Sequence, residues 1–351
     1  MPSIPLPVVG ISCGDPNGIG IEVILKTFED RRILKSFTPL VFCNNKLFSE
    51  QMAALNIKLD YIKISSTKKI INGKINVINV WDHVFETDFG NPTNDSGKVS
   101  FLSLKASVKS LKSNEIDVLV TAPINKNNIQ NEEFKFPGHT DFLAKELEGN
   151  SLMFMITENL KIGLLTDHIP LKSINSHITK ERIQQKVSLI NNSLKKDFGV
   201  LKPKVAILSI DPHVGDGGVI GSDDDEVLKP ALIEMSNSGD LIFGPFSSDS
   251  FFGSDQYSKY DAVLAIYHDQ GLIPFKTISF GEGVNYTAGL KKIRTSPDHG
   301  TGYDIAGKGI ANHNSFKNAI FSAIDIFKNR KQYESLKKNP LPFKNSKSSS
   351  K

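Results

Sequence analysis

Short apolar runs alternate with longer amphipathic stretches through most of the chain. Five runs of four to six residues consist almost entirely of aliphatic and small side chains, and they are Val8–Ser12, Val118–Thr121, Ile162–Thr166, Val205–Ile210 and Ala262–Tyr267. Apolar runs of this length are typical of strands that are buried on both faces. Because helix-like segments separate the runs, the pattern predicts an α/β protein with a parallel sheet.

Helices are expected where the stretches between these runs are amphipathic. The expected helices are Ile21–Phe37, Ser100–Lys112, Thr179–Phe198, Asp225–Asn237 and Ser315–Asn329. The polar, turn-forming segment Glu86–Lys98 is expected to be a loop. Residues 339–351 are mostly Asn, Pro, Ser and Lys, so this Lys/Ser tail is expected to be flexible because it has little to bury.

Length and composition predict an ordinary globular protein. The chain has 351 residues, and roughly 100–200 residues per domain makes two domains the expectation. Hydrophobic residues make up 39% and charged residues 23%, which excludes a wholly disordered or fibrous protein. The net charge is +4, but residues 331–351 contain six lysines and one glutamate, so the rest of the chain is close to neutral. This distribution argues against a nucleic-acid-binding surface.

Cysteine content and the start of the chain indicate a cytoplasmic protein. The two cysteines, Cys13 and Cys43, are too few for a disulfide framework or a multi-cysteine zinc site, which fits a reducing compartment. The first nine residues lack the basic segment and long apolar stretch of a secretory signal. No apolar run approaches the ~20 residues that a membrane helix needs, so no membrane association is expected.

Three of the five predicted strands are followed by a histidine. His168, His213 and His268 come directly after the third, fourth and fifth apolar runs. Ligands of parallel α/β proteins bind beyond the carboxyl ends of the strands, where three neutral imidazoles could hold a divalent metal ion. The neighbouring Asp167, Asp211 and Asp269 could then orient the rings. A single histidine in such a place is more often a turn or capping residue, and the coincidence of three favours the metal site.

Two further segments favour anion or nucleotide binding. Pro137–Asp141 resembles a loop that leads into a helix, where free backbone amides attract phosphate, although plain capping by Thr140 or Asp141 explains it equally well. Lys276, Asn285 and Arg294 fall in glycine-rich, loop-like sequence, for which a solvated surface is the simpler explanation.

The segment from 298 to 309 is dense in glycine and holds His, Tyr and two Asp residues. It is either a plain turn or a close-fitting nucleotide loop. The chain has no Gly-x-Gly-x-x-Gly motif after a strand and no Walker A motif, so a dinucleotide would have to bind in another way.

Eight motifs together identify the chain as similar to a known enzyme family. They are GDPNGIG, TAPINK, PGHTD, LTDHIPL, DPHVGDGG, YHDQGLIPFK, FGEGVNYTAGL and IRTSPDHGTGYDIAGKG, and they extend from Val8 to Phe327. In this order they resemble the 4-hydroxythreonine-4-phosphate dehydrogenase (PdxA) family. The resemblance implies an isocitrate/isopropylmalate dehydrogenase-like fold, with two α/β/α domains around a central cleft. The expected domains are 1–135 with 300–338, and 136–299, followed by the tail.

The resemblance also implies a set of site residues. The metal ligands would be His168, His213 and His268, which are the same three histidines that follow strands. The substrate would contact His139, Thr140, Lys276, Asn285 and Arg294. The cofactor loop would include His299, Gly300, Thr301 and Asp304. The candidate catalytic residues are Lys276, Asp249 and Asp269, and a structural role is equally plausible for either aspartate.

The family resemblance implies oxidation of 4-phosphooxy-L-threonine by NAD, or alternatively NADP. The expected product, 2-amino-3-oxo-4-phosphooxybutanoate, loses carbon dioxide to give 3-amino-2-oxopropyl phosphate in vitamin B6 biosynthesis. A zinc, magnesium or cobalt ion would assist, in a homodimer whose sites draw residues from both subunits. One alternative is the oxidation of threonate or erythronate 4-phosphate. Another is a metal-dependent phosphohydrolase or aldolase, and a third is a catalytically silent metabolite-binding protein.

The sequence departs from the family pattern at four positions. Asp211 replaces an asparagine, Val219 replaces a second histidine, and Gly302 and Tyr303 replace Ala and Phe. These changes leave the three proposed ligands in place. They bear on the groups around the ligands and on the choice of substrate.

Overall fold

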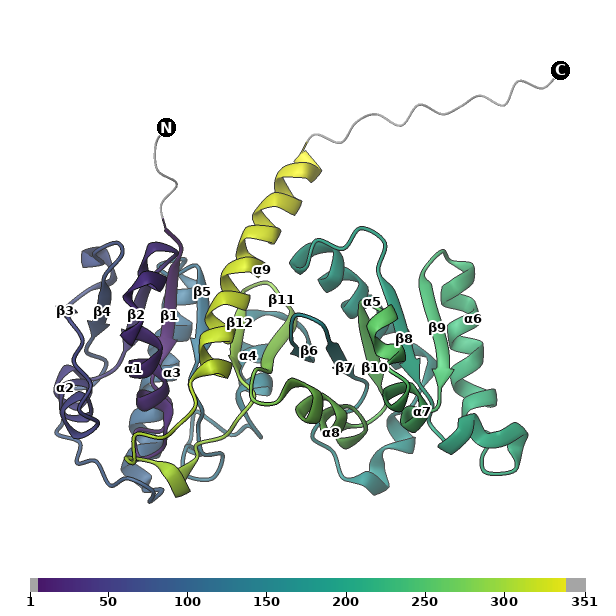
Figure 1. The fold of residues 1–351 in the computed structure, drawn as a ribbon, viewed down its shortest axis with the longest axis horizontal. Coiled ribbons are helices and arrows are strands. Elements are labelled where there is room, and N and C mark those ends of the chain that lie inside the picture. Colours follow the sequence, from purple (N-terminus) through teal and green to yellow (C-terminus); the bar gives the residue numbers. More distant parts are fainter. Residues whose placement is uncertain (1–5, 339–351) are drawn as a thin grey trace.

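One continuous mixed sheet organises the molecule. The computed structural model describes residues 6–338 and places their twelve strands in the order β3-β4-β2-β1-β5-β12-β11-β6-β7-β10-β8-β9 (Figure 1). The strands are β1 Val8–Ser12, β2 Thr38–Phe42, β3 Tyr61–Ile64, β4 Ile75–Ile78, β5 Val118–Thr121, β6 Gly149–Ile156, β7 Lys161–Leu164, β8 Lys204–Leu208, β9 Leu241–Phe246, β10 Ala262–Ala265, β11 Val284–Leu290 and β12 Arg294–Pro297.

Helices lie along this sheet, and none between residues 6 and 338 has an apolar stretch long enough to traverse a bilayer. The helices are α1 Gly20–Glu29, α2 Asn45–Ala54, α3 Asn94–Lys112, α4 His139–Leu147, α5 Lys180–Asp197, α6 Lys229–Asn237, α7 Ser248–Gly253, α8 His268–Ser279 and α9 Asn314–Lys338.

The sheet is parallel at both ends and antiparallel in the middle. All pairs from β3 to β12 are parallel, as are β7 with β10, β10 with β8 and β8 with β9. Strand β11 is antiparallel to both β12 and β6, and β6 is antiparallel to β7. The five predicted strands are confirmed. The prediction of a parallel sheet is wrong for its centre, where β11 runs antiparallel to β12 and β6, and β6 runs antiparallel to β7.

Local capping explains where the predicted helix boundaries were wrong. Helix α1 ends at Glu29, because the Asp30 side chain accepts from the Arg32 amide and starts a separate 3-10 turn. Helix α3 begins at Asn94 and not at Ser100, because Thr93 and Ser96 form a reciprocal capping box inside the expected loop.

Two other helices also differ from their predicted spans. A π turn precedes α6, and α9 runs nine residues past its expected end at Asn329. The predicted tail, residues 339–351, lies outside the described residues.

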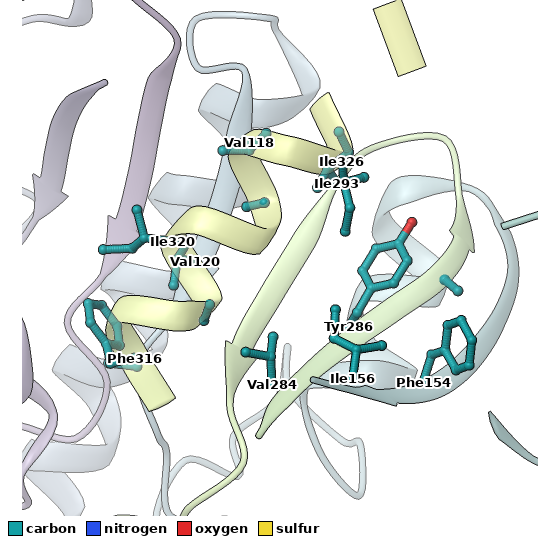
Figure 2. Close-up of a cluster of buried hydrophobic side chains, with 14 of the residues drawn as sticks. Val118, Val120, Phe154, Ile156, Val284, Tyr286, Ile293, Phe316, Ile320 and Ile326 are labelled. Carbon is teal, nitrogen blue, oxygen red and sulfur yellow. The ribbon is translucent and has the colours of Figure 1, made fainter. Parts of the chain in front are cut away.

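Helix α9 connects the two parallel parts of the sheet. It packs against β5, β12 and β11 and also contacts α5. In Figure 2, Phe316 and Ile320 of α9 gather with Val118 and Val120 of β5 in one buried cluster. Since this cluster includes buried residues from both parts of the sheet, the core is continuous across it. The expected division into two domains stays a prediction.

A buried ion pair attaches α9 to the rest of the fold. Arg330 Nε donates to Asp197 Oδ1 at 2.6 Å, and the Tyr286 hydroxyl donates to Asp197 Oδ2 at 2.6 Å. Arg330 Nη1 also donates to the carbonyl oxygens of Leu290 and Lys291. Asp197 is 2% exposed and Arg330 is 7% exposed, so each charge depends on the other for compensation.

Replacing Arg330 with Met should destabilise the protein strongly. The substitution leaves the Asp197 carboxylate buried without a cation, so we expect the free energy of unfolding in urea to fall by about 3–5 kcal/mol. The double variant Arg330→Met/Asp197→Leu should regain most of this loss, since neither charge is then buried. A loss under about 1 kcal/mol in the single variant would contradict the role of the pair.

Candidate functional site

A cavity of about 280 Å³ lies where the central strands meet α4 and α8. All five predicted substrate-contacting residues line it, and they are His139, Thr140, Lys276, Asn285 and Arg294. They come from four separate elements, because β12 runs parallel to β5 and the start of antiparallel β11 lies beside the end of β12. The structure therefore brings together residues that are 155 positions apart in the chain.

Three of these residues are not in the loops where the sequence pattern placed them. Arg294 begins β12, Asn285 lies on β11, and Lys276 lies on α8. The alternative of a solvated surface is wrong for Arg294, which is 1% exposed. Lys276 is exposed at the cavity mouth.

Arg294 is a buried cation with no carboxylate partner among residues 6–338. Its Nε donates to the Thr121 hydroxyl at 3.0 Å, and its Nη1 donates to the Thr287 hydroxyl at 3.1 Å. Burial lowers the pKa of Arg294 to about 9, which still leaves the group charged at neutral pH. A buried guanidinium held by two neutral hydroxyls is well suited to bind an anionic ligand.

Helix α4 brings its N-terminus to the same cavity. Its N-cap residue is Gly138, with no side chain to cap the first turn. The alternative of capping by Thr140 or Asp141 is therefore wrong, because both residues lie inside the helix. Burial of the ring, together with the charges of Arg294 and Lys126, holds the pKa of His139 well below its ordinary value.

Several polar atoms around the cavity lack a partner. They are His139 Nε2, Asn285 Oδ1 and His299 Nε2, each buried without a hydrogen-bond partner in the described part of the chain. Buried polar atoms are normally paired, so unpaired ones that line one cavity indicate a ligand. Together with Arg294, they offer both donors and acceptors to a small polar molecule.

Two of the three predicted metal ligands lie together. The rings of His168 and His268 have centroids 5.5 Å apart, and both line the cavity that contains Arg294. His268 Nδ1 lies 2.6 Å from Asp269 Oδ1, which leaves Nε2 free to bind a metal ion. Partial burial and the nearby Lys126 charge lower the pKa of His168, which favours the neutral ring.

His213 lies apart from this pair. It lines a larger, neighbouring cavity of about 840 Å³ together with Asp211, Asp249 and Asp269. Among residues 6–338 no group of three metal-ligating side chains converges on one point. The Ser247 hydroxyl and the Ser250 amide bind Asp249 and lower its pKa, which makes it a weak base.

A buried carboxylate fixes the predicted cofactor loop. Asp15 is fully buried and accepts hydrogen bonds from the Asn17 amide and from the side chains of Ser96, Asn128 and Tyr303, at 2.8–3.0 Å. These contacts join the loops after β1 and β5 to the segment 298–309. Tyr303 makes its contact through the hydroxyl that a phenylalanine at this position would lack.

The predicted cofactor residues divide into two groups. His299 and Gly300 line the 280 Å³ cavity beside Arg294. The Thr301 carbonyl accepts from the Ile19 amide at 2.8 Å and so attaches the segment to the loop after β1. Asp304 lies in a short 3-10 turn just beyond. His299 and Gly300 therefore place one end of this loop next to the predicted substrate-contacting residues.

Several residues that line the cavity were not among the predicted site residues, and Lys126 is the one of them that carries a positive charge. Lys126, in the motif TAPINK after β5, lies at the cavity mouth near His139 and His168. Lys126 could have been identified from the sequence, because it follows a predicted buried strand, as His168, His213 and His268 do.

Known proteins match most of this chain. Residues 35–323 match the family model described as pyridoxal phosphate biosynthetic protein PdxA. The 4-hydroxythreonine-4-phosphate dehydrogenase of Bacteroides thetaiotaomicron is 43% identical over 335 residues, which cover 95% of this chain and 92% of that protein. The protein of the same name from Sulfurihydrogenibium sp. is 39% identical and covers 92% of this chain and 99% of its own.

Solved structures agree with the sequence matches. The crystal structure of 4-hydroxythreonine-4-phosphate dehydrogenase from Klebsiella pneumoniae aligns with a TM-score of 0.78 at 27% identity. The alignment covers 93% of this chain and 98% of that one. The predicted family resemblance and the α/β fold class are confirmed.

Replacing Arg294 with Met should stabilise the ligand-free protein. The folded-state pKa of about 9 lies below the ordinary 12.5, so burying the charge costs stability at pH 7, and the cost is relieved only as pH rises through 9. We expect the free energy of unfolding in urea at pH 7 to rise by about 1–4 kcal/mol.

Arg330→Met is the matched control, because it removes a paired arginine and should have the opposite sign. A loss of stability in Arg294→Met would show that the buried guanidinium is compensated in the free protein.

Proposed function

The chain belongs to the PdxA family of pyridoxal phosphate biosynthetic proteins, and on that premise we propose that it oxidises 4-phosphooxy-L-threonine. The family makes it an oxidoreductase that uses an NAD-type cofactor. Oxidation of the C3 hydroxyl gives 2-amino-3-oxo-4-phosphooxybutanoate, which then loses carbon dioxide to give 3-amino-2-oxopropyl phosphate. The observation that supports this substrate most directly is the buried Arg294 cation in a cavity with unpaired polar atoms.

Arg294 is suited to hold the substrate carboxylate. A guanidinium presents parallel N–H donors that match a planar carboxylate, and burial strengthens such a contact. His139 and Thr140, in the first turn of α4, then lie where the phosphate of the same molecule would be held. Asn285 supplies an unpaired acceptor for the substrate ammonium group. The cavity thus fixes both ends of the substrate and positions C3 between them.

The two paired histidines fit a divalent metal ion. His168 has a lowered pKa, and Asp269 orients His268, so both rings have the properties of ligands. A bound cation would lower the pKa of the substrate hydroxyl and stabilise negative charge on its oxygen. NAD, held along the segment 299–304, would accept the hydride.

Lys276 is the best placed of the three candidate catalytic residues for proton transfer. It lines the cavity with Arg294, whereas Asp249 lies in the neighbouring cavity beside His213. Asp269 already holds His268 Nδ1 at 2.6 Å, so its role is to fix the orientation of that ring. We assign to Lys276 the proton transfers that accompany oxidation and decarboxylation.

A second copy of the chain is needed to complete the metal site. His213 does not join His168 and His268 within one chain, so we assign the third ligand to His213 of the partner subunit. Large apolar side chains are exposed on α8 and at its C-terminal end, with Ile273 at 64% and Phe280 at 89% exposure. Covering such side chains favours association into a homodimer.

The decisive experiment is a substrate panel. The purified protein is incubated with NAD, a divalent metal ion and one of three compounds, which are 4-phosphooxy-L-threonine, threonate 4-phosphate and erythronate 4-phosphate. The absorbance of NADH measures turnover. The highest kcat/KM should be that for 4-phosphooxy-L-threonine.

Other outcomes of the panel would identify another reaction. A higher kcat/KM for either threonate or erythronate 4-phosphate would assign the protein to that substrate. Consumption of substrate without NAD would instead indicate a phosphohydrolase or aldolase.

Mixing two inactive variants should restore activity if the site is shared. His168→Ala and His213→Ala should each lose metal-dependent turnover while remaining folded dimers. In a mixed dimer one site lacks both His168 and His213, and the other site has all three histidines. Because about half of the dimers are mixed after random exchange, we expect about a quarter of wild-type activity. No recovery, with mixed dimers present by mass spectrometry, would mean that His168 and His213 serve one site from the same chain.

A further inference from the structure

Lys126 occupies a position that the proposed mechanism does not use. It belongs to the loop after β5 and lines the 280 Å³ cavity beside His139 and Arg294. Its side chain extends over the N-cap of α4, since a Cβ added to Gly138 would lie 3.5 Å from Lys126 Cε. The lysine therefore brings a positive charge to the start of this helix.

The Lys126 ammonium group has no carboxylate within ion-pair distance among residues 6–338. Its charge reaches into the site, where it contributes to lowering the pKa of His139. Some lysines of this protein are paired with an acid on the same surface, as Lys105 is with Glu133. Lys126 instead lies at the mouth of a cavity whose floor is the Arg294 cation.

The charges of the substrate require more than one cation. 4-Phosphooxy-L-threonine carries a carboxylate at one end and a phosphate at the other. Arg294, at the floor, matches the planar carboxylate. The phosphate then lies toward the first turn of α4, whose N–H groups have no acceptor within the helix.

We propose that Lys126 is a substrate-binding residue that contacts the phosphate at the N-terminus of α4. The assignment rests on the proposed function and names the residue by which the site selects phosphorylated substrates. A flexible ammonium group suits phosphate because it acts as a point charge and needs no planar partner. Lys126 and the helix amides thus form one side of the cavity, and Arg294 forms the other.

Three variants test this assignment against the wild type. They are Lys126→Met, Lys126→Arg and the control Lys135→Met, which removes an exposed lysine from the same connection without altering the cavity. For Lys126→Met we expect the KM for 4-phosphooxy-L-threonine and the inhibition constant of inorganic phosphate to rise about tenfold or more. The KM for NAD should stay within about twofold of wild type, because the lost contact is to substrate alone.

The other two variants separate charge from structure. Lys126→Arg should recover most of the affinity, since a guanidinium also binds phosphate. Lys135→Met should match the wild type in all three constants. Equal substrate KM and equal phosphate inhibition in Lys126→Met and the wild type would overturn the assignment.

A binding measurement without turnover distinguishes this proposal from the proposed function. Inorganic phosphate should raise the melting temperature of the wild type and not that of Lys126→Met. If the wild type binds phosphate through Lys126 but oxidises none of the panel compounds, the proposed function fails and this assignment stands. If phosphate stabilises neither protein, or both equally, this assignment fails whatever the enzyme oxidises.

Discussion

A buried positive charge without a carboxylate is the constraint on which the site depends. Arg294 is fixed by the hydroxyls of Thr121 and Thr287, so its orientation is set by three neighbouring strands before any ligand arrives. Burying such a group costs free energy, and an anionic substrate recovers that cost when it binds. The contrast with Arg330, equally buried but paired with Asp197, is instructive. Arg330 compensates a buried carboxylate, whereas the charge of Arg294 is available to an anionic ligand.

The mixed topology of the sheet makes this arrangement possible. The parallel strands at either end supply loops at their carboxyl ends, which carry Lys126, His168 and His268. The central strands β11 and β12 supply side chains from within the sheet, including Asn285 and Arg294. Side chains on strands move less than those on loops, so the floor of the cavity is rigid and its mouth is adaptable. A ligand held by Asn285 and Arg294 would therefore take its orientation from the sheet.

The sequence predicted the parts of the fold that obey simple patterns. Continuous apolar runs identified five strands, and the segment Pro137–Asp141 was expected to lead into a helix, which begins within it as α4. Seven of the twelve strands were not predicted. In β11 and β12 glycine and polar residues interrupt the apolar positions, as in β12, which begins with Arg294, whereas β6 contains a continuous apolar run that was overlooked. Such strands are stabilised by pairing with distant neighbours, and this long-range information is absent from local periodicity. Family resemblance supplied the proposed substrate residues that the sequence pattern had placed in loops.

The three proposed metal ligands are only partly brought together in one chain. Strand-end placement correctly predicted that His168 and His268 would meet, because β7 and β10 are adjacent parallel strands. His213 follows β8, which is the next strand along, yet its loop carries the ring into a separate cavity. The groups proposed to bind the substrate therefore line one cavity of a single chain, whereas the three proposed metal ligands do not converge within it. If the third ligand comes from the partner, substrate binding does not require assembly of the dimer, whereas oxidation does. Association would then control the chemistry without altering the affinity for the phosphorylated substrate.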